Sequence, residues 1–502
     1  MAKALMIQGT GSGAGKSLIT AALCRIFRDK GLSVAPFKAQ NMALNSAITM
    51  DGGEIGRAQA LQAEAAGIEP TVDMNPILLK ASGDMSSQVI VQGKVRASMR
   101  AQEYYAFKKE AWKAVQESYR RLSRQYDVIV MEGAGSPAEI NLLKVDIVNM
   151  AAAKLAKAPV LLVGDIDKGG VFASLYGTVK LLGRDSRHIR AFIINKFRGD
   201  MEILRPGLDM IRDKTGKPVI GVLPYLREIG LPEEDGLALE RSPLSAARNT
   251  ELGTVKIVVV RLRYISNFTD FDPLDREPDV ELLYSQNPSE IENADMLIIP
   301  GSKNTVKDLL FLRERGLDES IKRARKKGVR IMGMCGGYQM LGRAIYDDQG
   351  AESPHKETQG LGLLDIETFF GTEKTTCRVE AEPVPGNELL ETGNQLLKGY
   401  EIHMGESRGS VGLFKVTRMS GNAGPILDGA GNSACWGTYL HGIFDNDLFR
   451  RDIINALRER KALPPLGPLV SYSKLKEKAL DTLAAAVRDN LDMAFVERIM
   501  GL

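Results

Sequence analysis

Gly9-Thr10-Gly11-Ser12-Gly13-Ala14-Gly15-Lys16-Ser17 decides the fold of the first half of this chain, because it joins the apolar run Ala4–Gln8 to a helical pattern at Leu18–Lys30. A glycine-rich turn between a buried strand and a helix surrounds phosphate oxygens with backbone N–H groups at the positive end of the helix dipole. Lys16 is placed to neutralise β- and γ-phosphate charge, and the Ser17 hydroxyl to bind Mg²⁺. We therefore expect ATP and Mg²⁺ at this loop. The residues expected to contact the nucleotide here are Thr10, Gly13, Gly15, Lys16 and Ser17.

Further apolar runs alternate with helical patterns such as Ala106–Gln125 through the first half of the chain. Their nearly continuous apolar character is typical of parallel strands that are buried on both faces. The alternation predicts a doubly wound α/β domain over residues 1–226. After Ala4–Gln8, the expected strands are Ser33–Lys38, Asp127–Met131, Pro159–Val163, Ala191–Asn195 and Pro218–Leu223.

Polar side chains follow several of these strands at their carboxyl ends, where a doubly wound sheet binds its ligands. Glu132 is placed to hold Mg²⁺ together with Ser17. Lys38 is placed to stabilise a transferring phosphoryl group, and Asn195 to hydrogen-bond the adenine. Asp165 and Asp167 either bind metal or shape a loop, and the sequence leaves that choice open.

The second half of the chain repeats the α/β alternation. The stretch 227–253 contains prolines and an acidic run without a clear apolar period, which predicts a linker. Expected strands then follow at Val255–Val260, Met296–Ile299 and Arg330–Gly333, with more between Gly360 and Leu440. We expect a second α/β domain over 254–446 and a helical extension over 447–502.

Cys335 lies in Gly333-Met334-Cys335-Gly336-Gly337, between an expected strand and a helix that begins near Tyr338 and extends to Ile345. A nucleophile on such a glycine-flanked turn faces the N–H groups of a helix N-terminus, which stabilise a thiolate and an oxyanion. Its base must be a histidine, and His441, which follows an apolar strand, is the first choice. His403 is the alternative. The loop Pro300–Thr305 is placed to supply a second oxyanion donor.

Composition narrows the function further. The chain has 502 residues, too many for a single core, and its net charge of +3 gives no reason to expect nucleic acid. It lacks the run of roughly 18 apolar residues that a membrane span needs, and Lys3 leads directly into an apolar strand rather than a cleavable signal. Cys24, Cys377 and Cys435 form no C-x-x-C pair and are expected in cores. We expect a cytoplasmic protein.

The phosphate loop resembles that of dethiobiotin synthetase, and the chain as a whole resembles the glutamine-hydrolysing cobyric acid synthases of cobalamin biosynthesis. The resemblance implies a class I glutamine amidotransferase-like second domain. It also implies ATP- and glutamine-dependent amidation of the b, d, e and g carboxylates of a corrinoid, adenosylcobyrinic acid a,c-diamide. Besides the two glycine turns, the motifs that carry the resemblance are Pro36–Ser46, Met131–Ser136, Gly164–Gly170, Asn195–Asp200 and Gly399–Gly405.

Two alternatives remain open. The related cobyrinic acid a,c-diamide synthase shares both domain types, and a regulatory or partitioning P-loop ATPase could carry an inactive glutaminase-like domain. Gly11 stands where partitioning ATPases have a lysine, which weighs against the second alternative. Ordinary class I glutaminases have a glutamate two residues after the catalytic histidine, but His441 is followed by Gly442 and Ile443. The sequence therefore indicates a Cys–His pair whose third member, if any, comes from elsewhere.

Overall fold

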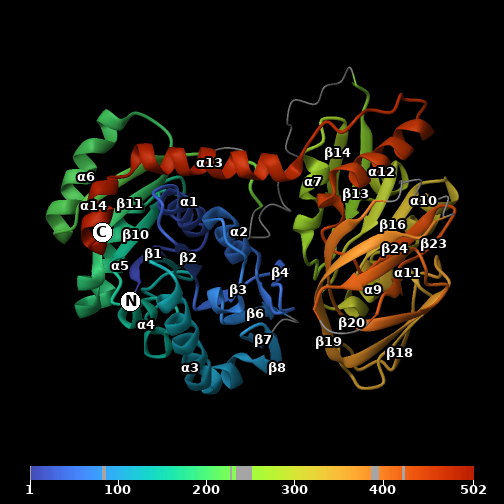
Figure 1. Cartoon of the computed structure of the whole chain (residues 1–502), viewed down its shortest axis with the longest axis horizontal. Coiled ribbons are helices and arrows are strands. Elements are labelled where there is room, and N and C mark those ends of the chain that lie inside the picture. Colours follow the sequence, from blue (N-terminus) through green and yellow to red (C-terminus); the bar gives the residue numbers. More distant parts are fainter. Residues whose placement is uncertain (1, 82–85, 227–228, 233–251, 386–394, 421–423) are drawn as a thin grey trace.

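The computed structural model of the protein describes residues 2–81, 86–226, 229–232, 252–385, 395–420 and 424–502. Most of the linker expected at 227–253 lies outside these residues. Figure 1 shows two α/β bodies side by side, joined along one edge by a long helix near the C-terminus. No helix in the described ranges is long and apolar enough to cross a membrane.

The first domain is built on a six-stranded sheet in the order β12-β11-β10-β1-β9-β2, in which all neighbours pair in parallel. The buried β1 (Lys3–Gly9) lies near its centre, as expected of a nearly continuous apolar run. This topology confirms the predicted doubly wound domain. The other five strands are β2 (Val34–Phe37), β9 (Val128–Glu132), β10 (Val160–Asp165), β11 (Ile189–Phe197) and β12 (Val219–Pro224).

Helices cover both faces of this sheet. One face packs against α3 (Ala101–Gln125), α4 (Met150–Ala156) and α5 (Val171–Leu182), and the other against α1 (Lys16–Asp29). A further helix, α6 (Met201–Thr215), runs between β11 and β12. The apolar residues of the strands are divided between the cores on the two faces of the sheet. The polar residues at the carboxyl ends of the strands are therefore available to bind ligands.

A smaller region between β2 and α3 contains strands that the sequence did not predict. It contains a four-stranded sheet in the order β3-β6-β7-β8, a two-stranded β4–β5 hairpin and the helix α2. In Figure 1 this region faces the second domain. Its elements are β3 (Gln40–Met42), β4 (Ser46–Ile48), β5 (Glu54–Gly56), α2 (Arg57–Ala66), β6 (Ile77–Ala81), β7 (Ser86–Val91) and β8 (Lys94–Arg100).

The second domain has a six-stranded sheet in the order β14-β13-β15-β16-β24-β23, parallel except at β23. A second sheet is built around the long antiparallel pair β19 (Ile366–Pro383) and β20 (Leu397–Gly409). The elements of the first sheet are β13 (Val255–Val260), β14 (Val280–Ser285), β15 (Met296–Ile299), β16 (Arg330–Met334), β23 (Ala430–Asn432) and β24 (Cys435–Thr438). The strands that join β19 and β20 in the second are β17 (Ala344–Tyr346), β18 (Glu357–Gln359), β21 (Phe414–Arg418) and β22 (Ile426–Asp428).

Four further helices lie in this domain: α7 (Asp272–Asp275), α8 (Pro288–Glu292), α9 (Thr305–Glu314) and α10 (Leu317–Lys326). The helix after Cys335 is shorter than predicted. It begins at Gly336, ends at Leu341 as α11, and gives way to a strand at Ala344. Gly342 is extended at that point and ends the helix.

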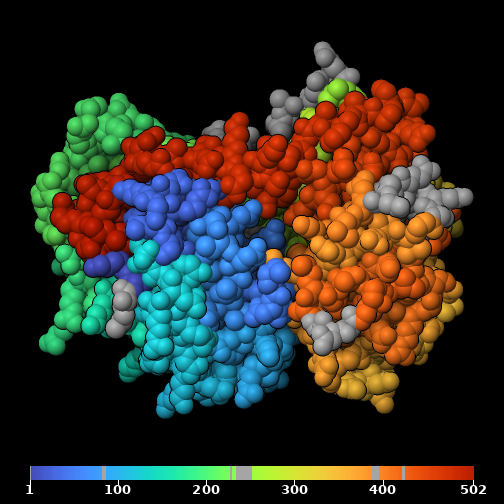
Figure 2. Space-filling model, in the orientation of Figure 1, coloured from blue at the N-terminus to red at the C-terminus, as the bar shows by residue number. Residues whose placement is uncertain are grey.

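The tail divides between the two domains. The helix α12 (Asp447–Arg460) packs into the core of the second domain, whereas α13 (Tyr472–Asn490) packs on α1 of the first. The final helix, α14 (Met493–Met500), joins the same core as α13. Figure 2 shows this tail, in red, running over both domains on one face of the molecule. The chain therefore ties its two domains together after both have been completed.

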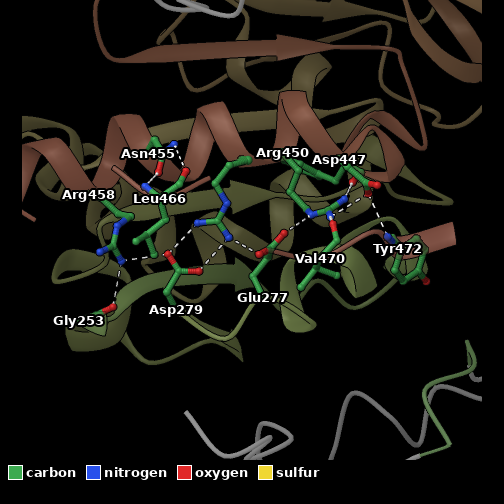
Figure 3. A network of polar contacts seen from close by, with 12 residues as sticks. Gly253, Glu277, Asp279, Asp447, Arg450, Asn455, Arg458, Leu466, Val470 and Tyr472 are labelled. Atoms are coloured by element: carbon green, nitrogen blue, oxygen red, sulfur yellow. Dashed lines mark hydrogen bonds and ion pairs between the residues drawn. The ribbon is translucent and has the colours of Figure 1, made fainter. Parts of the chain in front are cut away.

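A buried ionic network fixes α12 where the tail leaves the second domain (Figure 3). Arg450 Nε lies 2.7 Å from Glu277 Oε1, and Arg451 Nη1 and Arg458 Nη1 lie 2.9 and 3.0 Å from Asp279 Oδ2. Arg450 also pairs with Asp447, so three guanidinium groups face three carboxylates. Balanced pairing of this kind is what makes buried charge tolerable.

Candidate active sites

The phosphate loop lies between the end of β1 and the start of α1, as predicted. Gly13 and Gly15 have φ angles of 71° and 97°, in the region that favours glycine. A Cβ on Gly15 would lie 2.1 Å from the Asn195 amide nitrogen, so a side chain is also excluded sterically. Lys16 Nζ donates to the carbonyl oxygens of Gly11 (2.8 Å) and Gly135 (3.2 Å), and Thr10 N donates to Val163 O (2.9 Å). The loop is therefore anchored on neighbouring strand ends.

Glu132, at the carboxyl end of β9, is the centre of the polar contacts beneath this loop. It is 1% exposed, and its Oε1 accepts hydrogen bonds from Ser17 Oγ (2.8 Å) and Lys38 Nζ (2.9 Å). Its Oε2 accepts from Gln62 Nε2 at 2.7 Å. Burial alone would raise the pKa of Glu132, but the Lys38 ammonium and these hydrogen bonds lower it below its usual range. The structure thus brings Ser17, Lys38 and Glu132 together as an ionised cluster.

These residues fit a magnesium-bound nucleotide. A hydroxyl and a carboxylate are adjacent hard oxygen donors, and Mg²⁺ usually takes only one or two of these from protein. No group of three or more His, Cys, Asp and Glu side chains in the described ranges could hold a metal ion alone. The buried side-chain amide of Gln8 also has no hydrogen-bond partner within the described part of the chain. A site with so few protein ligands would take the remaining Mg²⁺ ligands, and the hydrogen-bond partners of Gln8, from phosphate oxygens and water.

The polar residues at the carboxyl ends of β10 and β11 contact the phosphate loop and hold it in place. Asn195 Nδ2 donates to Ala14 O at 2.9 Å, and Lys196 Nζ donates to Gly13 O at 2.7 Å. Lys196 also pairs with Asp165 at 2.8 Å, and Asp167 pairs with Arg198. Both aspartates therefore contact cations and shape the loop in this structure. The contact of Asn195 with adenine stays a prediction.

Cys335 lies on a strained turn between β16 and α11. Its φ and ψ angles are 51° and −109°, a conformation that costs free energy for any residue other than glycine and is concentrated at functional sites. A Cβ on Gly337 would lie 1.9 Å from Ile299 O, so glycine is required where the turn crosses β15. A Cβ on Gly336 would lie 3.0 Å from Ser302 N, which places the loop Pro300–Thr305 beside the turn. That position supports the predicted second oxyanion donor.

His441 follows β24 and is 1% exposed. Its Nδ1 lies 2.6 Å from Asp270 Oδ2, and the Tyr400 ring stacks on its imidazole at 5.1 Å between centroids. Burial alone would lower the pKa of His441, but the Asp270 carboxylate and the sulfur of Cys335 raise it to about 9. Its Nε2 has no hydrogen-bond partner among the described side chains and main-chain groups, which leaves this nitrogen for proton transfer at the thiol.

Asp270 is a candidate residue of this site that the sequence did not reveal. It lies on a short 3-10 helix, η6 (Phe268–Phe271), is 4% exposed and accepts a hydrogen bond from Gly442 N at 3.1 Å. The residues around it in sequence carry no recognisable spacing to His441. Only its place soon after β13, the first strand of the second domain, could have suggested it, since Cys335 and His441 also follow strands of that sheet.

His403 and the other three cysteines have structural surroundings. His403 on β20 is stacked on Tyr439 at 3.9 Å, and its Nδ1 lies 2.7 Å from Gly405 O. Cys24, Cys377 and Cys435 are buried. Burial raises the pKa of the Cys24 thiol well above its usual range and that of Cys435 to about 12, which suits core residues.

The two sites are connected by a docked hairpin. Residues of the β4–β5 hairpin in the first domain contact the second domain next to His441. Ser46 N donates to Asn267 Oδ1 at 3.1 Å, Arg378 Nε donates to Ile48 O at 2.8 Å, and Thr376 Oγ1 donates to Gly52 O at 2.7 Å. In Figure 2 the blue segment that carries this hairpin abuts the orange second domain. The first domain therefore reaches the residues around the thiol.

Comparison with known proteins agrees with this division. Residues 5–239 match the family model described as the CobQ/CobB/MinD/ParA nucleotide binding domain, and residues 256–449 match that of the CobB/CobQ-like glutamine amidotransferase domain. The chain is 51% identical over 502 residues to a cobyric acid synthase of Thermodesulfovibrio yellowstonii, with 100% of each chain covered. It is 48% identical to one from Syntrophobacter fumaroxidans, covering 100% of this chain and 99% of that one.

Proposed function

The chain belongs to the cobyric acid synthase family, and from this premise we propose that it converts adenosylcobyrinic acid a,c-diamide to adenosylcobyric acid by amidating the b, d, e and g carboxylates. It is an amidoligase with a glutamine amidotransferase domain, which supports glutamine-dependent amidation in cobalamin synthesis. The nucleotide-binding domain implies ATP as the source of energy. The corrinoid, the four positions and the steps below are the proposal.

One observation carries the proposal: the strained Cys335 and the Glu132 cluster lie in different domains, and a hairpin of the first domain is docked beside His441. A glutamine hydrolase would need only the Cys335 site, and a kinase only the Glu132 site. Docking of the two supports a reaction in which one domain produces ammonia and the other consumes it.

At the glutaminase site, the Cys335 thiolate attacks the side-chain amide carbon of glutamine. The backbone N–H of Gly336 and the loop carrying Ser302 are placed to stabilise the oxyanion. His441 donates its proton to the leaving nitrogen, so that ammonia departs and a thioester remains. His441 then takes a proton from water as it attacks the thioester, which gives glutamate and restores the thiolate. Asp270 fixes the imidazole through Nδ1 throughout.

At the synthetase site, an oxygen of a substrate carboxylate attacks the γ-phosphorus of ATP, which gives an acyl phosphate and ADP. Lys16 and Lys38 are placed to balance the charge that develops on the phosphoryl oxygens. Mg²⁺ held by Ser17 and Glu132 would supply further charge neutralisation when bound. Ammonia then attacks the acyl carbon, and phosphate and a proton leave as the amide forms.

Two alternatives stay testable. A cobyrinic acid a,c-diamide synthase would amidate the a and c carboxylates instead, and a regulatory ATPase would leave glutamine unchanged. The deciding experiment offers the protein each corrinoid separately, with ATP, Mg²⁺ and glutamine, and follows product mass. Four successive amidations of the a,c-diamide support the proposal. Amidation of cobyrinic acid alone favours the first alternative, and no glutamate release favours the second.

A further inference from the structure

Charged side chains from both domains meet in the buried contact between them. Glu54 on β5 and Lys80 on β6 belong to the first domain, and each is 1% exposed. Lys374 comes from β19 of the second domain, and Lys303 from the loop beside Cys335. Glu54 pairs with Lys80 and, at 2.7 Å, with Lys374. We call these four residues the junction cluster.

The junction cluster has more amines than carboxylates. Two lysines, Lys80 and Lys374, pair with Glu54, and Lys303 lies close enough for their charges to shift its pKa. The other polar partners are neutral: Ser46 Oγ lies 2.6 Å from Lys80 Nζ, and Gln88 Oε1 lies 3.0 Å from Lys374 Nζ. The ionic network on α12 is different, because its three guanidinium groups meet three carboxylates. Unbalanced buried charge is costly. A contact needed only for docking would be expected to have the balanced form.

Burial and the two neighbouring ammonium groups hold the pKa of Lys303 well below its usual range, and burial also lowers the pKa of Lys374. The junction cluster thus combines positive charge with an amine that readily becomes neutral. A cation entering it meets repulsion. A neutral molecule with both a lone pair and N–H groups can exchange hydrogen bonds with the lysines.

The junction cluster lies between the two sites. Lys303 directly follows Ser302, whose backbone nitrogen lies beside Gly336 at the thiol turn. Charge on the Cys335 sulfur acts on Lys374 strongly enough to influence its pKa. On the other side, Glu54 begins β5, which leads directly into α2, and Gln62 of that helix donates to Glu132 at 2.7 Å. The junction cluster is therefore flanked by segments that reach the thiol turn on one side and Glu132 on the other.

We propose that Lys303, Lys374 and Lys80 around Glu54 form a cationic filter, which lets neutral ammonia pass from the thiol site to the synthetase site and repels ammonium. This inference rests on the proposed function. Ammonia leaves as the thioester forms. It is neutral at that point, and it stays nucleophilic as long as it is not protonated on its way to the synthetase site. Ammonium in solution is the dominant external form near neutral pH, and the filter denies it the same entrance. No bond is made or broken in this transfer.

The test measures where the amide nitrogen comes from. Wild-type protein receives unlabelled glutamine, ATP, Mg²⁺, the a,c-diamide and ¹⁵N-ammonium chloride near neutral pH. Product mass gives the ¹⁵N share, and glutamate is counted per amide formed. We expect wild type to use glutamine nitrogen, with about one glutamate per amide as the stoichiometry requires. Lys303→Met and Lys374→Met keep the length of the side chain but remove its amine, and each should raise the ¹⁵N share on the order of tenfold.

Leakage is the second readout. Glutamate per amide should rise in both variants, because ammonia lost to solvent is no longer delivered. Lys307→Met is the matched control: Lys307 is exposed on α9, a few residues from Lys303, and this change should leave both readouts unchanged. Thermal unfolding of each variant reports whether it folds, and either variant alone suffices for the test.

The outcomes separate the two proposals. If wild type makes no amide from glutamine, the proposed function is wrong. If wild type couples glutamine to amide, but both cluster variants keep the wild-type ¹⁵N share and glutamate ratio, the filter is wrong and the junction cluster only holds the domains together.

Discussion

Asp270 Oδ2 lies 2.6 Å from His441 Nδ1, although 171 residues separate the two in sequence. This contact adds a carboxylate to the proposed Cys335–His441 pair, although the histidine is followed in sequence by Gly442 and Ile443. The same 3-10 helix is preceded by Asn267, which accepts a hydrogen bond from Ser46 of the first domain. Asp270, which contacts His441, therefore lies close in sequence to Asn267, which contacts the first domain.

Asp270→Asn should slow glutamine hydrolysis by about 10²–10⁴-fold, the range found when a buried carboxylate behind a catalytic histidine is neutralised. The pH profile should also change. Asp270 raises the pKa of His441 to about 9, so the imidazolium that protonates the leaving amide nitrogen is lost as pH rises through about 9. Without the carboxylate this pKa falls, and the alkaline limb of kcat/KM moves to lower pH.

Tyr400→Phe is the control for this prediction. It removes a weak 3.4 Å hydrogen bond to Asp270 but keeps the ring that stacks on His441. Its alkaline limb should stay near that of wild type. An unchanged limb in Asp270→Asn would show that the carboxylate does not set the protonation of the base.

The sheet of the first domain was predictable because each strand is a short, almost continuous apolar run. β10 and β9, for example, are buried along their whole lengths. The β3-β6-β7-β8 sheet was not, because its strands are short or largely exposed: β8 has no fully buried residue. Packing on α3 of the first domain, rather than a local apolar pattern, positions this sheet.

The candidate sites divide in the same way. Lys16, Ser17 and Cys335 belong to local turns whose glycine spacing can be read directly from the sequence. Asp270 meets His441 only through the folding of distant segments, and the junction cluster combines residues from two domains. No local pattern connects Glu54 with Lys374, which is 320 residues away. Such residues become visible only when the chain is folded.

Cys335→Ala should abolish glutamine-dependent amidation and leave amidation with ammonium salts, because the thiolate serves only glutamine hydrolysis. His441→Ala should behave in the same way, and His403→Ala should lose much less, since His403 is held against Tyr439 and Gly405. Glutamate release and corrinoid mass are measured in parallel. Continued use of glutamine by Cys335→Ala at the wild-type rate would remove it from the nucleophile role.

Lys16→Ala should stop amidation from glutamine and from ammonium alike, because carboxylate activation precedes both. Loss of one donor that stabilises transition-state charge typically lowers the rate by roughly 10²–10³-fold. Lys168→Ala is a suitable control, because Lys168 lies near the loop but makes only a 3.4 Å contact with Ser12 O. Retained ammonium-dependent amidation in Lys16→Ala would contradict the phosphate-loop assignment.

Asp279→Asn should lower the free energy of unfolding of the second domain by about 3–5 kcal/mol, because it leaves two buried guanidinium groups without their shared carboxylate. Glu319→Gln is the control: its ion pair with Lys322 is exposed, so its unfolding midpoint should stay near that of wild type. Urea unfolding followed by Trp436 fluorescence, in a Trp112→Phe background, measures both. Equal midpoints for the two variants would show that the network contributes little.

Glu132→Gln should raise the Mg²⁺ requirement of amidation and slow phosphoryl transfer, while glutamate release continues at least in part. The change keeps the size of the side chain but removes the charge on which Ser17, Lys38 and Gln62 converge. A Mg²⁺ site with so few protein oxygens depends strongly on each one. Because Glu132 lies in the first domain and Cys335 in the second, glutamine hydrolysis serves as an internal measure of folding. Product formation is titrated against Mg²⁺ with saturating ATP, and a curve that matches wild type would exclude Glu132 from the metal site.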